Sequence, residues 1–144
     1  MVYRSSTLVP PAVLLVDDEA PFLETLSKRI AKRNLKVSTA LSGSEALDKL
    51  KAGGGASNYD VVILDVKMPG MDGLEALAAI KQKHPNMEVI MLTGHATVES
   101  AIEGMKAGAF DYLMKPCDID LLLAKIDRAV VKKREHEEKI LQAR

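Results

Sequence analysis

The sequence predicts an α/β domain built on a five-stranded parallel sheet, and two observations support this. Short runs rich in β-branched residues alternate five times with amphipathic stretches, which is typical of parallel strands whose connecting helices cover both faces of the sheet. The chain has 144 residues, of which 47% are hydrophobic and 28% charged. That length and balance favour a single soluble globular domain.

The first two strand and helix units come before residue 53. Ala12–Val16 is an unbroken apolar run of strand length that ends at two aspartates. A helix is expected from Pro21 to about Asn34, because apolar residues recur every fourth position behind a proline suited to the first helical turn. Leu35–Ala40 alternates like an edge strand, and the helix expected at Ser42–Leu50 is closed by a glycine triplet, interpreted as a flexible loop.

Three more units follow along the chain. Strands are predicted at Val61–Leu64, Glu88–Leu92 and Asp111–Met114, and glycine and proline residues at 69, 70 and 73 break the chain after the first of these. Each strand precedes an apolar helix face, and these faces comprise Leu74, Leu77 and Ala78; Val98, Ala101, Ile102 and Met105; and Ile119, Leu122, Leu123, Ile126 and Val130. The last face is the most regular, so we expect that helix to pack firmly on the sheet.

The chain beyond Val131 loses its apolar stripe but keeps charge pairs at helical spacing, which are Lys133 with Glu137, Arg134 with Glu138, and Glu135 with Lys139. The last helix is therefore expected to protrude into solvent. Two interpretations stay open: a solvated helix end, or a signalling linker or dimerising coil suggested by Ile140 and Leu141. The predicted organisation is an N-terminal extension at 1–11, a domain at 12–131 and a charged helical extension at 132–144.

Charge and composition exclude several classes of function. Twenty basic and twenty acidic residues leave no formal net charge, so direct nucleic-acid binding or attraction to anionic lipid is not expected. The single cysteine, Cys117, cannot form an internal disulfide. No stretch approaches the roughly 18 apolar residues of a membrane span, and Pro10 and Pro11 interrupt the only segment that could hold a targeting signal. A cytoplasmic location is expected.

Chemically active side chains follow the predicted strands, and they are Asp17, Asp18 and Glu19, then Asp65, Thr93 and Lys115. Because parallel strands end at one edge of the sheet, residues just after them should meet there. Clustered carboxylates repel one another, and Mg²⁺ offsets such repulsion using one or two carboxylates, waters and phosphate oxygens. Zinc is a poor candidate because no histidine or thiolate cluster accompanies these acids.

These residue types suit phosphoryl transfer, whose loose transition state needs an in-line nucleophile and positive charge around the equatorial oxygens. Asp65 is the candidate nucleophile. Mg²⁺ held by Asp18 and Asp65, the Lys115 ammonium and the Thr93 hydroxyl would each stabilise a phosphoryl oxygen.

The same residues resemble the response-regulator receiver family of two-component signalling. The resemblance covers about Ala12 to Val130 and rests on Asp17-Asp18-Glu19, Asp65 within Leu64 to Gly70, Thr93-Gly94 and Lys115-Pro116. It implies a flavodoxin-like, doubly wound (βα)5 fold with strand order 2-1-3-4-5. It also implies a phosphoacceptor switch, rather than an enzyme, that catalyses its own phosphorylation and dephosphorylation and receives its phosphoryl group from a sensor histidine kinase or histidine phosphotransfer protein.

The resemblance further implies a role for each site residue. Asp65 would be the phosphoacceptor, and the Mg²⁺ ligands would be Asp65, Asp18, the backbone carbonyl of Lys67 and, through a water, Asp17. Thr93 and Tyr112 would be switch residues, Lys67 and His95 would tune hydrolysis, and Lys115-Pro116 would be a cis peptide. The implied output is a partner or output domain, with transcription regulation suggested, and a homodimer could form through the last two helices and the fifth strand.

Other functions fit the sequence less well. A phosphatase of the haloacid dehalogenase type would need an aspartate two residues after its nucleophile, where this chain has Lys67. A flavodoxin would need a hydroxyl-rich phosphate loop in place of Asp17 and Asp18, and no nucleotide-binding glycine loop is present. Two alternatives stay open: Tyr112 could be an ordinary core aromatic, and the domain could be an interaction module of the same fold that works without phosphorylation.

Overall fold

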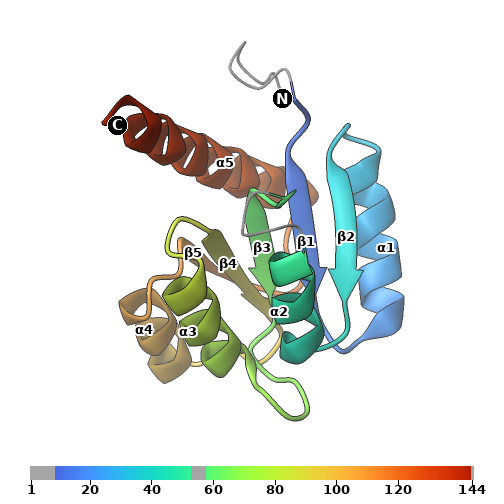
Figure 1. Ribbon diagram of the computed structural model, residues 1–144. Coiled ribbons are helices and arrows are strands. Elements are labelled where there is room, and N and C mark those ends of the chain that lie inside the picture. Colours follow the sequence, from blue (N-terminus) through green and yellow to red (C-terminus); the bar gives the residue numbers. More distant parts are fainter. Residues whose placement is uncertain (1–8, 53–57, 144) are drawn as a thin grey trace.

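The computed structural model describes residues 9–52 and 58–143, and within them it confirms the predicted fold (Figure 1). Five parallel strands lie in the order β2-β1-β3-β4-β5. The strands are β1 (Ala12–Val16), β2 (Lys36–Ala40), β3 (Val61–Leu64), β4 (Glu88–Thr93) and β5 (Asp111–Met114). The helices are α1 (Ala20–Ala31), α2 (Gly43–Ala52), α3 (Gly73–Lys83), α4 (Val98–Lys106) and α5 (Ile119–Gln142). The glycine triplet lies outside the described residues.

Two hydrophobic clusters sandwich the sheet. Successive side chains of a strand point to opposite faces, so Val13 and Leu15 of β1 join the cluster under α1 and α5, while Leu14 and Val16 join the cluster under α2 and α3. Strands β1, β3 and β4 are almost wholly buried and β2 and β5 are partly exposed, as central and edge strands should be. The sheet is therefore held rigidly on both faces, which fixes the positions of the residues that follow each strand.

Helix ends differ from the predictions by a few residues. Helix α1 ends at Ala31 rather than near Asn34, because Asn34 takes a φ of 67°, the left-handed conformation that commonly closes a helix. Helix α2 begins just after Ser42, whose hydroxyl accepts a hydrogen bond from the Glu45 N–H at 3.1 Å. This bond satisfies a backbone donor that the first helical turn leaves free.

The C-terminal part of α5 is less exposed than the sequence suggested. Lys133 pairs with Glu137 at 3.0 Å as expected, but only 2% of the Lys133 side chain is exposed. The predicted pair of Arg134 with Glu138 is wrong, since Arg134 instead forms two 3.1 Å bonds with both carboxylate oxygens of Asp60. A half-buried ion pair with two hydrogen bonds is stronger than a solvated pair along a helix. Arg134 therefore pairs with Asp60 rather than with Glu138.

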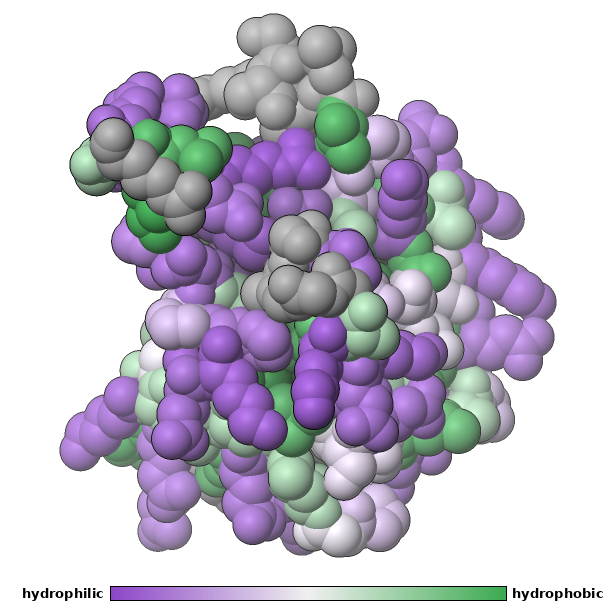
Figure 2. All heavy atoms as spheres, viewed as in Figure 1, coloured by the Kyte–Doolittle hydropathy of each residue, from purple (hydrophilic) through white to green (hydrophobic). Residues whose placement is uncertain are grey.

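Within the described part of α5, the segment that is solvated on all sides is its end, residues 138–142. Ile140 and Leu141 are exposed, and Figure 2 shows hydrophobic side chains at this end of the helix amid a largely hydrophilic surface. Among the described residues, no helix has both the length and the apolar character needed to cross a membrane.

Candidate functional site

Three acids meet at the carboxyl edge of the sheet, where β1 and β3 end side by side. Val16 and Leu64 are paired in register, so the residues that follow them are neighbours. Asp17, Asp18 and Asp65 each bring one carboxylate oxygen within 4.8 Å of the others. Asp17 and Asp65 are buried and Asp18 is exposed. The convergence predicted for these three residues is thus present.

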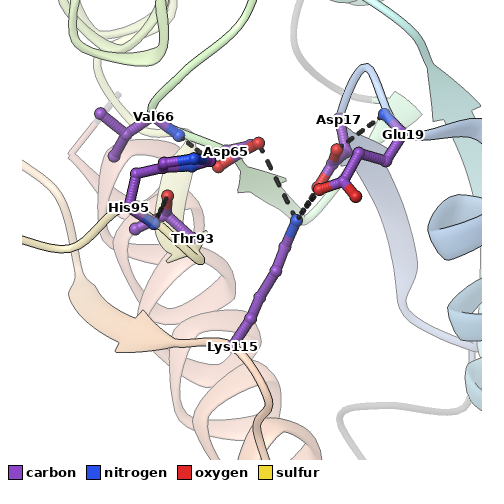
Figure 3. Close-up of polar contacts among 7 residues, drawn as sticks. All are labelled: Asp17, Glu19, Asp65, Val66, Thr93, His95 and Lys115. Atoms are coloured by element: carbon purple, nitrogen blue, oxygen red, sulfur yellow. Dashed lines mark hydrogen bonds and ion pairs between the residues drawn. The ribbon is translucent and has the colours of Figure 1, made fainter.

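The ammonium group of Lys115 forms ion pairs with the acids of this cluster. Lys115 reaches in from the end of β5, and its Nζ lies 2.6 Å from Asp17 Oδ2, 3.1 Å from Glu19 Oε1 and 3.9 Å from Asp65 Oδ2 (Figure 3). The Lys115-Pro116 peptide is cis, as expected. Lys115 therefore lies closer to the acids after β1 than to Asp65.

The pKa values of Asp17 and Lys115 are both raised. Burial raises the pKa of Asp17, and repulsion from Asp65 adds to this, so that together they outweigh the hydrogen bonds from Lys115 and the Glu19 N–H. Burial alone would lower the pKa of Lys115, but its hydrogen bonds to Asp17 and Glu19 outweigh that effect and the pKa is raised. Both shifts favour the protonated form, which is expected where several carboxylates share one cation.

The backbone fixes the orientation of Asp65. Its Oδ1 accepts a hydrogen bond from the Val66 N–H at 2.8 Å, while Oδ2 points toward Lys115. Gly73 packs directly beneath: a Cβ at this position would lie 2.0 Å from the Asp65 carbonyl oxygen and 2.6 Å from Val66 Cα. In the sequence, Gly73 indicates only a break in the chain. The contact could not be inferred from the sequence, although a glycine directly after the capping residue Asp72 is a weak signal of close approach.

Thr93 and His95 lie on the Asp65 side of the site. Thr93 is fully buried at the end of β4, and its Oγ1 accepts a hydrogen bond from the His95 N–H at 3.0 Å (Figure 3). His95 and Lys67 both line an open cavity of about 410 Å³ that gives access to Asp65. Its full lining is Asp18, Glu19, Asp65, Lys67, Met68, Pro69, Asp72 and His95.

Tyr112 lies away from the acids, on β5 under α4. It is half-buried, packs against the core cluster beneath α2 and α3, and its hydroxyl is 2.6 Å from Ser100 Oγ. This placement links the fifth strand to the start of α4.

The donor set fits a hard divalent cation. The three converging groups are all carboxylates, and oxygen is the ligand atom that Mg²⁺ prefers. Burial first, and repulsion from Asp65 second among the causes that raise it, make the charged form of Asp17 unfavourable without a further cation. These residues could therefore hold a metal ion, and one divalent charge would relieve their repulsion.

The sequence has extensive similarity to known regulators. Residues 13–127 match the model of the response regulator receiver domain. The chain is 41% identical over 116 residues to the DNA-binding transcriptional regulator NtrC of Klebsiella pneumoniae, covering 81% of this chain and 24% of that protein. It is 36% identical over 118 residues to the transcriptional regulatory protein ZraR of Escherichia coli, covering 82% and 26%. The chain thus spans about a quarter of the length of these relatives.

Solved structures agree with the sequence matches. A response regulator receiver domain from Clostridium thermocellum superposes with a TM-score of 0.80 at 37% identity, covering 86% of this chain and 97% of that one. The BeF3-activated receiver domain of DrrB gives 0.74 at 33% identity, covering 85% and 98%. With the acidic pocket in place, these matches show that the chain belongs to the response regulator receiver domain family and functions in phosphorylation-based signalling.

Proposed function

We propose that Asp65 accepts a phosphoryl group, with Mg²⁺, from a sensor histidine kinase or histidine phosphotransfer protein. One observation carries this assignment: a buried carboxylate has one oxygen fixed by the Val66 N–H and the other directed toward Lys115 beside an open cavity. An acid so placed is a nucleophile held in one orientation, with a positive charge within reach of the group that it would receive.

The transfer follows from this geometry. An Asp65 oxygen forms the new bond to phosphorus as the bond between phosphorus and the donor nitrogen breaks. Lys115, now 3.9 Å from Asp65 Oδ2, stabilises a phosphoryl oxygen. Asp18, Asp65, the carbonyl of Lys67 and, through a water, Asp17 would hold Mg²⁺, which would neutralise further phosphoryl charge.

The proposed switch starts from two existing hydrogen bonds. Thr93 Oγ1 now accepts from the His95 N–H, and the Tyr112 hydroxyl is paired with Ser100. Phosphorylation would draw the Thr93 hydroxyl toward the new phosphoryl oxygens, and Tyr112 would leave Ser100 to fill the vacated space. The two packings then differ in contacts that the phosphoryl group can bias.

The proposed readout surface comprises α4, β5 and α5. It carries exposed apolar side chains, including Val98 at 77%, Ile102 at 49% and Met114 at 64%. An exposed apolar patch suits a protein partner, and a homodimer through these elements is part of the proposal. We also propose a cytoplasmic phosphoacceptor switch at 12–131, acting through 132–144 on a partner or output domain that regulates transcription.

The direct test is phosphorylation by acetyl phosphate in the presence of Mg²⁺, read by intact mass. The native chain should gain one phosphate, about 80 Da, and Asp65→Asn should gain none. Asp60→Asn is the matched control, since Asp60 is a buried acid at the opposite end of β3, and it should still be phosphorylated. If the native chain gains no phosphate, the interaction module that works without phosphorylation becomes the better assignment.

Lys67 and His95 are the proposed modulators of the phosphorylation lifetime, since both line the cavity beside Asp65. His95→Ala should change the rate at which the phosphorylated chain loses its phosphate, followed by intact mass after removal of acetyl phosphate. An unchanged half-life would remove His95 from this role.

A further inference from the structure

Phe22 lies under the ammonium group of Lys115, and sequence analysis gave it no role at the site. We propose that Phe22 is a positioning residue: its ring holds Lys115 beside the acids after β1 and thereby weakens Mg²⁺ binding in the unphosphorylated protein. The inference rests on the proposed metal site and adds a determinant of its affinity.

The ring and the ammonium are in direct contact. Lys115 Nζ lies 4.0 Å from the centroid of the Phe22 ring, which is within the range of a cation–π interaction. Phe22 belongs to the first turn of α1 and packs from behind against the core cluster shared by α1 and α5. Only 13% of the Lys115 side chain is exposed, so water screens the contact poorly. The Phe22 ring therefore stabilises the ammonium group of Lys115 in the position that it has in this structure.

The position of Lys115 conflicts with a bound metal ion. Its Nζ is 2.6 Å from Asp17 Oδ2, and Asp17 is one of the three acids that could hold the ion. A divalent cation at these carboxylates would repel the ammonium, which must then move away from Asp17. Phe22 stabilises Lys115 only in the metal-free position. An interaction present in one state alone shifts the equilibrium toward that state, so the ring opposes metal binding.

The contact between Phe22 and Lys115 sets the direction in which a substitution of Phe22 should change Mg²⁺ affinity. In Phe22→Leu the apolar volume is largely kept but the aromatic face is lost. The metal-free position of Lys115 loses a contact worth about a two- to fivefold change in equilibrium constant, so Mg²⁺ should bind about two- to fivefold more tightly. If Phe22 served only to pack the core, its loss would leave Mg²⁺ affinity unchanged or weaken it.

The chain provides a matched control, because it has only two phenylalanines. Phe110 is also half-buried, belongs to the same core cluster and has a lysine over its ring. That lysine, Lys132, has its Nζ 5.6 Å from the centroid and pairs with Glu88 at the start of β4, at the edge of the sheet opposite the three acids. Mg²⁺ affinity would be measured by calorimetry on the full chain for the native protein, Phe22→Leu, Phe22→Tyr and Phe110→Leu. Only Phe22→Leu should bind more tightly, and Phe22→Tyr should match the native chain.

A second measurement needs no variant. The Cε protons of Lys115 should show an upfield ring-current shift in metal-free protein, and this shift should be lost on titration with Mg²⁺. Equal or weaker Mg²⁺ binding by Phe22→Leu, or a Lys115 shift that Mg²⁺ does not change, would overturn the inference while leaving the metal site intact. A native chain that binds no Mg²⁺ would overturn the proposed metal site itself, and the inference with it.

Discussion

Strand β3 has a buried aspartate at each end, and the two carboxylates differ in their hydrogen-bond and ion-pair partners. At its start, Asp60 Oδ2 accepts from the Ala12 N–H at 3.0 Å, and Arg134 binds both Asp60 oxygens at 3.1 Å. At its end, the Asp65 carboxylate accepts a hydrogen bond from the Val66 N–H and faces other acids around an ammonium that is 3.9 Å away.

The contrast separates a structural acid from a reactive one. Asp60 has its charge matched by Arg134 and each of its carboxylate oxygens accepts a hydrogen bond, so it joins β1 and α5. Asp65 is buried with its charge incompletely offset, an arrangement that costs stability and is expected where a protein must bind something. Burial alone does not identify a functional acid, whereas unmet charge beside a cavity does.

The largest predicted effect concerns the backbone beneath Asp65. Gly73→Ala should lower the free energy of unfolding by on the order of 3 kcal/mol, because its Cβ would overlap the Asp65 carbonyl. Gly70→Ala is the control: its φ is +75° but no atom lies within 4 Å of a Cβ there, so about 1 kcal/mol is expected. Urea unfolding measures both, and equal losses would show that close approach at Gly73 is not what matters.

The next effect tests the structural acid. Asp60→Asn should destabilise the chain by about 2 kcal/mol, because Arg134 loses its charged partner in a half-buried site. Arg134→Gln should cost a similar amount, and the double variant should cost less than the sum of the two. Additive losses in urea unfolding would mean that the two residues are not coupled.

The same substitution at the other end of β3 should have the opposite sign. Asp65→Asn should stabilise the metal-free chain by about 1 kcal/mol, because one of the clustered charges is removed. Mg²⁺ should stabilise the native chain but have little effect on Asp65→Asn. If Asp65→Asn destabilises as Asp60→Asn does, the distinction between the two acids fails.

The smallest effect is a dependence on pH. The pKa of Asp17 is raised above its ordinary 3.8 in the folded state, so the folded protein binds this proton more tightly than the unfolded one. The resulting stability is present below pH 3.8 and is lost as the pH rises through the raised value. The native chain should therefore lose stability relative to Asp17→Asn over that window, and of the effects described here this one is expected to be the smallest. The measurement is urea unfolding of both proteins at a series of pH values. A difference in the free energy of unfolding between the native chain and Asp17→Asn that does not change with pH would contradict this prediction.

The sequence predicted the strands and the meeting of Asp17, Asp18 and Asp65 because both depend on local patterns and on one rule for parallel sheets. The strand order came from the family resemblance and not from periodicity. The position of Gly73 against Asp65 could not be predicted, since it depends on how a loop folds back on its own strand. Helical spacing likewise paired Arg134 with its neighbour along α5, because spacing carries no information on a partner 74 residues away.

The bond between Arg134 and Asp60 also gives α5 a pivot. From Arg134 to Gln142 the helix continues for eight residues, about 12 Å at 1.5 Å per residue, while its earlier turns pack on the sheet. A tilt of about 10° at the pivot would therefore displace the tip by roughly 2 Å. The last turns would thus follow any tilt of the packed part of α5 relative to the sheet.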